Sequence, residues 1–173
     1  MTHFDVFGLP PSVDLDVRAL EQQVRDLSMQ FHPDRAAHGD ARERRIALEK
    51  TTAVNDAFKV LKDPVRRAFY LLKLKGIDLE NDASAAAAKM PMAFLEEVME
   101  RREKLEGALR KKDLEAARAM AAEVVELKDA AFATAVNALK ADDTALAAHQ
   151  LGRVKYFTRF LEEVEAFEEE TLS

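Results

Sequence analysis

The chain has 173 residues, of which 48% are hydrophobic and 34% charged, a composition typical of a soluble globular protein with one domain or two small ones. It has no cysteine, which excludes disulfides, Cys-based zinc sites, Cys-ligated iron–sulfur clusters and a thiol nucleophile. Residues 1–75 carry 13 Lys and Arg against 11 Asp and Glu (net +2), and residues 76–173 carry 13 against 21 (net −8), so the second half argues against a nucleic-acid surface.

The first part of the chain predicts two helices, separated by a break at Leu9-Pro10-Pro11-Ser12. Thr2 can cap a short helix that ends at Gly8. Asp14 or Asp16 can cap a second helix, whose apolar residues follow the three-and-four spacing of one buried face. The inward-facing residues of this helix are predicted to be Val17, Leu20, Val24, Leu27 and Phe31.

Pro33 ends the second helix near Phe31, because the residue before a proline is disfavoured in the helical region. The following "DRAAHGD" predicts a loop. A third helix is expected over 41–61, and Asp63 followed by a proline predicts the start of a fourth helix that stops at residue 76. The inward-facing residues of the third helix are predicted to be Ile46, Ala53, Ala57, Phe58 and Leu61.

The second part of the chain predicts a linker and three long helices. Residues 77–90, "IDLENDASAAAAKM", have small and polar side chains without a strong period, which is typical of a linker. Helical patterns follow at about 92–110, 113–140 and 143–170. Because short breaks between long helices make antiparallel neighbours, these three predict a helical bundle. No strand pattern is present, so the whole fold is predicted to be all-α.

The tripeptide His32-Pro33-Asp34 lies at the start of the predicted loop. A histidine offers two ring nitrogens, and an aspartate offers a carboxylate that can accept a bidentate arginine. Held by a rigid proline, the pair suits a charged interface on another protein. The alternative is a simple helix stop with two solvated side chains.

The helix over 92–110 has more apolar surface than one bundle face needs. Leu95 and Met99 lie about a quarter turn or more from its core side and are neighbours one turn apart. Tyr156 lies similarly off the core side of the last helix, so the three side chains predict one exposed patch. The alternative is that Leu95 and Met99 pack against the linker or the first domain. The two core sides are predicted to be Phe94, Val98, Arg101, Leu105, Ala108 and Leu109, and Val154, Phe157, Leu161 and Val164.

The segments "FDVFGLP", "FHPDR" and "VNDAFKVLKDPVRRAFYLL" resemble a J domain. The whole chain is similar to the HscB type of J protein, the co-chaperone of bacterial iron–sulfur cluster assembly, through "HFDVFGLP", "DPVRRAFYLLKLKGIDLE" and "AFLEEVMERREKLE". It has no Gly/Phe-rich segment and no Cys-rich N-terminal extension, so we expect a bacterial member. The resemblance implies a J domain at 1–76, a linker at 77–90 and a three-helix bundle at 91–173, in an L-like arrangement.

The resemblance implies a co-chaperone that is not an enzyme and uses no cofactor or metal. The J domain would bind a DnaK/HscA-type ATPase chaperone and stimulate its ATP hydrolysis. The bundle would bind an IscU-like iron–sulfur scaffold protein and deliver it to the chaperone. The chaperone-binding residues implied are His32, Pro33, Asp34, Arg35, Arg25 and Arg18. The scaffold-binding residues implied are Leu95, Met99, Glu100, Glu103 and Tyr156.

Two departures from the family pattern stand out. Glu21 and Asp26 lie among the arginines of the second helix, so we expect either a weaker or salt-sensitive encounter with the chaperone, or a chaperone adapted to this protein. Glu96 stands where the family pattern prefers an apolar residue.

Two alternatives to the iron–sulfur co-chaperone stay open. One is a J protein that serves a different client. The other is a helical enzyme with His32 and Asp34 in a metal site, for which the sequence offers no further ligands at suitable spacing. With no signal-peptide pattern and no apolar run of bilayer length, we expect a cytoplasmic protein with no membrane or nucleic-acid partner.

Overall fold

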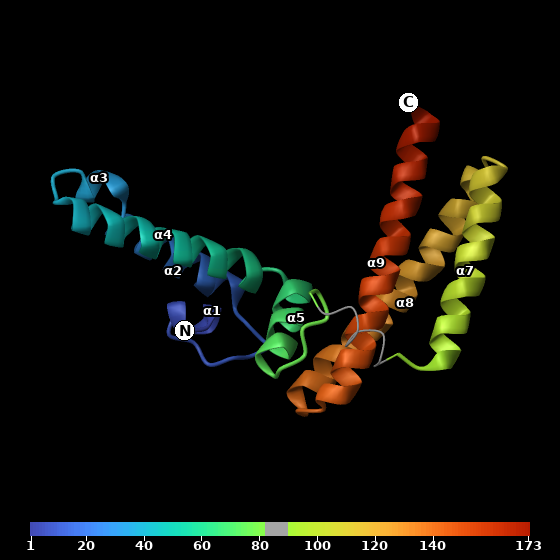
Figure 1. Ribbon diagram of the computed structural model, residues 1–173, viewed down its shortest axis with the longest axis horizontal. Helices are drawn as coiled ribbons and strands as arrows, with labels where there is room; N and C mark the ends of the chain where they lie inside the picture. Colours follow the sequence, from blue (N-terminus) through green and yellow to red (C-terminus); the bar gives the residue numbers. More distant parts are fainter. Residues whose placement is uncertain (82–89) are drawn as a thin grey trace. The chain divides into compact units, whose positions relative to one another are not determined.

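The computed structural model describes residues 1–81 and 90–173, and these form helices joined by turns, with no β-strand among them. The all-α prediction is confirmed. Two compact units divide the chain, unit 1 at Met1–Leu71 and unit 2 at Leu72–Ser173 (Figure 1). Of the predicted linker at 77–90, residues 82–89 lie outside the described part of the chain.

Unit 1 is built on a helical hairpin with shorter helices beside it. Its helices are α1 (His3–Val6), α2 (Val17–Gln30), α3 (Pro33–Ala36), α4 (Ala41–Leu61) and most of α5 (Pro64–Leu74). Thr2 caps α1 in a capping box, because its hydroxyl accepts from the amide of Asp5 and the Asp5 carboxylate accepts from the amide of Thr2. The carboxylates of Asp16 and Asp40 cap α2 and α4, so each long helix begins at a residue that satisfies its free amides.

The core of unit 1 corrects one prediction on α4. Ile46 was expected to face inward, but it is 40% exposed, and the neighbouring Ala47 is buried instead. One turn after Ala47, the hydroxyl of Thr51 donates to the backbone carbonyl of Phe31 at 3.3 Å. The stripe of α4 that faces α2 therefore starts one residue later than the pattern of large apolar residues indicates. The other buried core residues of unit 1 include Phe4, Leu20, Val54, Ala57, Leu61 and Ala68.

A buried arginine joins the loop before α2 to the end of α4. Arg67 is only 6% exposed. Its Nε donates to the carbonyl of Val13 at 2.9 Å, and its Nη1 donates to the carbonyl of Leu61 at 2.6 Å. Burial lowers the pKa of the Arg67 guanidinium. The two hydrogen bonds satisfy carbonyls that the end of α4 and the loop would otherwise leave unpaired.

Unit 2 contains the three long helices α7 (Met92–Arg110), α8 (Leu114–Lys140) and α9 (Thr144–Leu172). Both connections use the same chemistry: Lys112 and Asp142 adopt positive φ angles of 53° and 59°, and Asp113 and Asp143 cap the next helix. Such short turns make antiparallel neighbours, as the sequence predicts. None of the helices in the described part of the chain combines the length and the apolar character that a membrane span needs.

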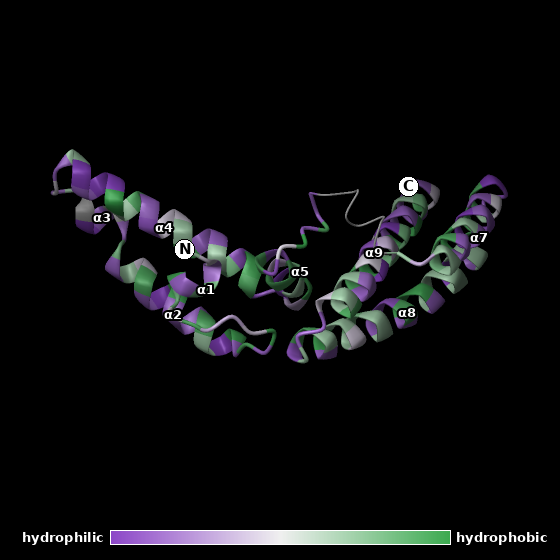
Figure 2. Ribbon diagram, turned by 60° about the horizontal axis from the view of Figure 1, so that its bottom comes forward, coloured by the Kyte–Doolittle hydropathy of each residue, from purple (hydrophilic) through white to green (hydrophobic). Residues whose placement is uncertain are grey.

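The helices of unit 2 meet through two kinds of interface. α8 and α9 pack closely against each other through small buried residues such as Ala135 and Ala148, and in Figure 2 α8 is coloured hydrophobic along most of its length. α7 instead meets α9 through large rings, because the rings of Phe94 and Phe157 lie edge to face with centroids 6.0 Å apart. The predicted core sides are confirmed for Phe94, Leu105, Ala108, Val154, Phe157 and Val164, which are buried. The other predicted core residues, Val98, Arg101, Leu109 and Leu161, are half-buried.

Candidate functional site

The tip of the hairpin contains a short helix where the sequence predicts a loop. Residues Pro33–Ala36 form α3, a single helical turn. Proline is favourable at the first position of a helix, because its fixed φ suits the helix and the amide it lacks would be unpaired there. The prediction of a loop throughout "DRAAHGD" is therefore wrong at its start. The tripeptide caps and begins α3.

The side chains of His32 and Asp34 point to solvent, with exposed fractions of 56% and 91%. His32 is the N-cap of α3, and its Nδ1 accepts a hydrogen bond from the amide of Asp34 at 3.2 Å. Because Nδ1 accepts that hydrogen, the neutral ring carries its proton on Nε2. Nδ1 also lies 3.5 Å from the carboxylate of Asp34, a contact that is an ion pair only when the imidazole is protonated. Both side chains are exposed enough to meet another molecule.

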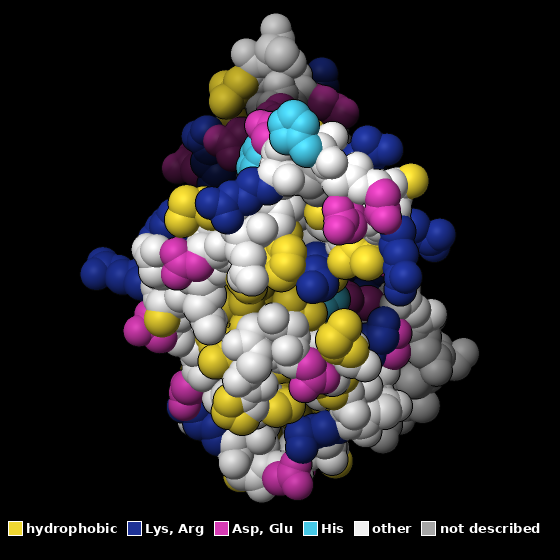
Figure 3. All heavy atoms as spheres, turned by 90° about the vertical axis from the view of Figure 1, so that its left-hand side faces the viewer, with side chains coloured by type: hydrophobic (Ala, Val, Ile, Leu, Met, Phe, Trp, Pro, Cys, Tyr) yellow, Lys and Arg dark blue, Asp and Glu magenta, His cyan; other side chains and the backbone are white. Residues whose placement is uncertain are grey.

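The basic residues predicted to bind the chaperone, on α2 and at the tip, differ in whether they already have a side-chain partner. Arg18 and Arg35 are exposed and make no ion pair within the described residues. Arg25 is exposed but donates through Nη2 to the side-chain oxygen of Gln22 at 2.9 Å, and Gln22 donates onward to Asp26 at 2.9 Å. In Figure 3, which looks onto this end of the hairpin, exposed imidazole rings lie among basic and acidic side chains. The positive field of α2 is thus mixed with acidic groups, as its sequence predicts.

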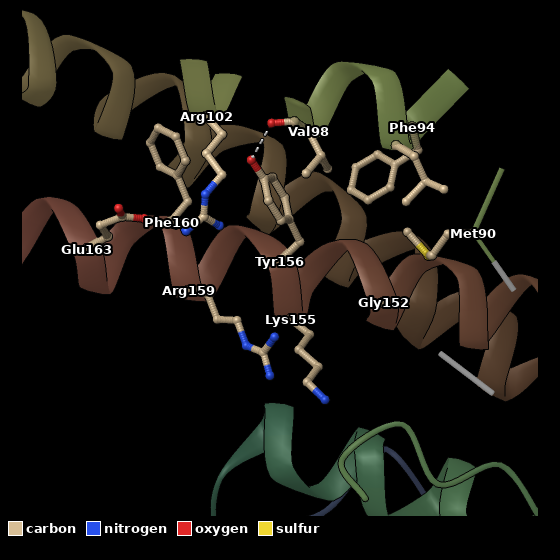
Figure 4. A pocket seen from close by; sticks show the side chains of 11 residues that line it. Met90, Phe94, Val98, Arg102, Gly152, Lys155, Tyr156, Arg159, Phe160 and Glu163 are labelled. Atoms are coloured by element: carbon tan, nitrogen blue, oxygen red, sulfur yellow. Dashed lines mark hydrogen bonds and ion pairs between the residues drawn. The ribbon is translucent and has the colours of Figure 1, made fainter. Parts of the chain in front are cut away.

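A hollow of about 310 Å³ lies between α7 and α9 in unit 2 (Figure 4). Aromatic rings from both helices line it, including Phe94, Tyr156 and Phe160. The Tyr156 ring meets the Phe94 ring edge-on with centroids 5.7 Å apart, and its hydroxyl donates to the carbonyl of Val98 at 3.1 Å. Burial raises the pKa of the Tyr156 phenol. The ring of Tyr156 is therefore held in one orientation as a wall of the hollow.

The five residues predicted to bind a scaffold are spread over three neighbouring areas. Leu95, which is 37% exposed, lines the hollow together with Tyr156. Met99 is 72% exposed and lies outside the lining, one turn beyond Leu95 on α7. Glu100 lines a smaller hollow of about 110 Å³ between α7 and α8, and Glu103 is exposed on α7. The structure thus brings Leu95 and Tyr156 together, leaves Met99 and Glu103 exposed on α7 outside that hollow, and places Glu100 toward α8.

The sequence reasoning missed the charged residues and the glycine of this hollow. Arg102, Lys155 and Arg159 contribute to its lining. Gly152 lies in the middle of α9, and a Cβ added there would be 2.7 Å from the sulfur of Met90. A glycine inside a long helix costs about 1 kcal/mol relative to alanine. Gly152 was therefore the one feature of the sequence that could have indicated a group packed against α9.

The comparisons with known protein families match both units. The DnaJ domain family matches residues 2–70, and the family described as the HSCB C-terminal oligomerisation domain matches residues 90–165. Together with the hairpin and the exposed side chains of His32 and Asp34 at its tip, these matches define a J-domain co-chaperone with a dedicated C-terminal helical domain.

The relatives narrow this class to one family. The chain is 38% identical over 173 residues to the co-chaperone protein HscB homolog of Vibrio cholerae (99% of each chain) and 36% identical over 170 residues to that of Vibrio vulnificus (98% of each). Among solved structures it resembles chaperone HscB from Vibrio cholerae, with a TM-score of 0.77, 35% identity and 99% of each chain covered. It also resembles human co-chaperone HscB, with a TM-score of 0.81, 27% identity, and 96% of this chain and 81% of that one covered. The chain belongs to the HscB family of co-chaperones.

Family membership implies a DnaK-type chaperone as the partner of the J domain. It gives no support to the alternative of a helical enzyme with a metal at His32 and Asp34. Within residues 1–81 and 90–173, no three His, Cys, Asp or Glu side chains lie together in a way that could hold a metal ion.

Proposed function

We propose that this co-chaperone binds an IscU-like iron–sulfur scaffold protein on the α7–α9 surface and delivers it to a DnaK/HscA-type chaperone, whose ATP hydrolysis it stimulates. The observation that carries the proposal is that two exposed and chemically different surfaces lie on separate units. One is the His32-Pro33-Asp34 tip of unit 1, and the other is the apolar hollow of unit 2. We assign the working cycle to the cytoplasm, in keeping with a cysteine-free chain.

The chaperone step uses groups that the tip holds ready. The exposed Asp34 carboxylate suits a bidentate arginine on the chaperone. The Nε2–H group of His32 is a donor for a hydrogen bond within the interface, and Pro33 starts the helical turn that carries both. Arg18, Arg25 and Arg35 would steer the encounter, because charges at the edge of an interface mainly raise the association rate.

The scaffold step uses apolar anchors with charged neighbours. Leu95 and Met99 are exposed apolar side chains on α7, and Leu95 meets Tyr156 at the hollow. Glu100 and Glu103 lie beside them on α7. An apolar centre ringed by charged groups is the usual composition of a protein-binding hot spot.

One observation favours a second candidate, a co-chaperone of this family type with a different client. Glu96 is exposed beside Leu95, where the family pattern prefers an apolar side chain, so the apolar area of α7 is smaller than that pattern implies. The J-domain step would be unchanged under this alternative. Only the identity of the protein bound by α7 and α9 would differ.

Chaperone ATP turnover distinguishes these candidates. The rate is measured for a DnaK/HscA-type chaperone alone, with this protein, and with this protein plus a purified IscU-type scaffold. We expect stimulation in the second sample and a synergistic increase in the third. Stimulation without synergy favours a different client, and no stimulation in either sample contradicts the proposed function.

A further inference from the structure

The hollow between α7 and α9 is a basic place in an acidic part of the molecule. Residues 76–173 carry a net charge of −8. The lining of the hollow nevertheless contains the three cations Arg102, Lys155 and Arg159 against the single anion Glu163. The net negative charge of this part of the chain favours a basic partner. The positive charge around the hollow does not fit that general attraction and needs a separate explanation.

The three cations differ in whether they already have a hydrogen-bond or ion-pair partner. Lys155 donates through Nζ to the backbone carbonyl of Leu79 at 2.5 Å. The Nη2 atom of Arg102 is 3.9 Å from a carboxylate oxygen of Glu163, a loose ion pair. Arg159 is exposed and has no hydrogen bond or ion pair within the described part of the chain. Figure 4 shows Arg159 projecting from α9 on the side away from Tyr156. Arg159 thus leaves a positive charge unmatched beside an apolar hollow.

The outer side of α7 has the opposite charge. Glu96 and Glu103 are exposed there, whereas Glu100 lines the smaller hollow against α8. The first two carboxylates lie beside Leu95 and Met99, whose exposed fractions are 37% and 72%. Across the α7–α9 surface the order is therefore acidic, then apolar, then basic.

We propose that the surface of the scaffold that docks here carries the complementary order of charge. An apolar side chain lies beside Leu95 and Tyr156, carboxylates face Arg159, and basic groups face Glu96 and Glu103. This inference rests on the proposed function and adds the basic half of the site, which extends it onto Arg159. The order permits one orientation of the scaffold, because the reversed orientation would bring like charges together at both edges.

A matched pair of charge reversals tests the basic half. Arg159→Glu and Arg110→Glu each lower the net charge by two, but Arg110 is exposed in the last turn of α7 and lines neither the hollow nor the neighbouring one against α8. Titration with a purified IscU-type scaffold should show about fivefold weaker binding for Arg159→Glu at low salt, and no more than a small change for Arg110→Glu. The difference should shrink as salt screens the exposed charges.

Charge exchange with the scaffold tests the orientation. Surface carboxylates of the scaffold are changed one at a time to lysine, and each variant is titrated against Arg159→Glu and against Glu103→Lys. We expect at least one scaffold variant to restore binding to Arg159→Glu and to leave the weak binding of Glu103→Lys unrepaired.

The outcomes separate the inference from the function on which it rests. Equal binding of Arg159→Glu and Arg110→Glu overturns the inference, and so does the absence of any scaffold variant that restores Arg159→Glu. In both cases the proposed function stands, because the wild-type protein still binds the scaffold. No binding of the scaffold to the wild-type protein overturns the proposed function and the inference together.

Discussion

The Nδ1 atom of His32 accepts a hydrogen bond from the backbone amide of Asp34 at 3.2 Å. The first residue of the tripeptide therefore caps the helical turn that carries the third. This bond occupies Nδ1 and leaves Nε2, which holds the proton of the neutral tautomer, without a partner among the described residues. A histidine at this position caps the turn through Nδ1, and under the proposed function it would also donate to the chaperone through Nε2.

Two substitutions at His32 separate these roles. His32→Gln should abolish stimulation of the chaperone's ATP hydrolysis and leave scaffold binding intact. His32→Asn keeps a good N-cap acceptor but lacks the ring Nε2–H group, so we expect the same loss. Single-turnover ATP hydrolysis and scaffold titration measure the two activities. Full stimulation by His32→Asn would show that capping is the only role, and loss of both activities would indicate misfolding.

Removal of the apolar side chains of unit 2 that are proposed to contact the scaffold should weaken scaffold binding only. Met99→Ala combined with Tyr156→Ala should weaken scaffold binding about tenfold or more, because buried aromatic and apolar anchors dominate binding free energy. Stimulation of the chaperone without scaffold should be unchanged, since these residues belong to unit 2.

A control is needed because Tyr156 also packs on Phe94. Tyr156→Phe keeps that ring contact and removes only the hydroxyl that donates to Val98. It should bind the scaffold nearly as well as the wild-type protein. If the double alanine variant binds as tightly as the wild type, the scaffold does not use this surface.

The sequence predicts best those elements that local chemistry determines. The helix at Ala41–Leu61 has the expected bounds, because Asp40 caps its start and Asp63-Pro64 follows its end. The off-core position of Leu95 and Met99 follows from helical periodicity alone and is confirmed by their exposure. These features need no knowledge of what lies opposite in space.

The predictions that fail depend on partners distant in the sequence. Ile46 has the stronger apolar signal, but Ala47 is the buried residue, because the packing of α2 against α4 decides which side of α4 faces inward. The charge of the hollow depends on α7 and α9 meeting side by side, so Arg102 and Arg159, 57 positions apart, carry no common sequence signal. The α3 turn was missed because a loop pattern and a single helical turn after proline look the same in sequence.

The buried Arg67 predicts a large loss of stability. Arg67→Ala leaves the carbonyls of Val13 and Leu61 without their donors, and hydrogen bonds from a charged group contribute about 1.5–3 kcal/mol each. We expect the free energy of unfolding to fall by about 3 kcal/mol in urea titrations. The neighbouring Arg66 is exposed, so Arg66→Ala is the matched control, with a change within about 0.5 kcal/mol. Similar values for both variants would mean that the Arg67 bonds contribute little.

Two glycines inside helices should respond differently when each is changed to alanine. A Cβ at Gly107 in α7 meets nothing within 4 Å, so Gly107→Ala should stabilise the protein by about 1 kcal/mol through helix propensity. A Cβ at Gly152 in α9 would be 2.7 Å from the sulfur of Met90. Gly152→Ala should therefore gain less, because Met90 must move. Thermal unfolding compares the two, and an equal gain would show that Met90 is not held against α9.

The turn after α5 predicts a pH dependence of stability at acidic pH. A hydrogen bond from the side chain of Asn81, with further bonds from the Asn81 amide and Lys73, holds the pKa of Asp78 at about 2, below its ordinary value of 3.8. Because the folded pKa is depressed, the carboxylate stabilises the folded state above about pH 4, and this contribution is lost as the pH falls toward 2.

Asp78→Asn tests this dependence. The variant should be less stable than the wild type at pH 5–6, and the two should converge as the pH approaches the folded-state value of about 2. Urea midpoints measured across this range give the comparison. Asp129→Asn removes the same charge at an exposed position of α8. The difference in stability between this variant and the wild type should not shrink with falling pH in this way. A constant difference between Asp78→Asn and the wild type would mean that the charge of Asp78 does not stabilise the turn.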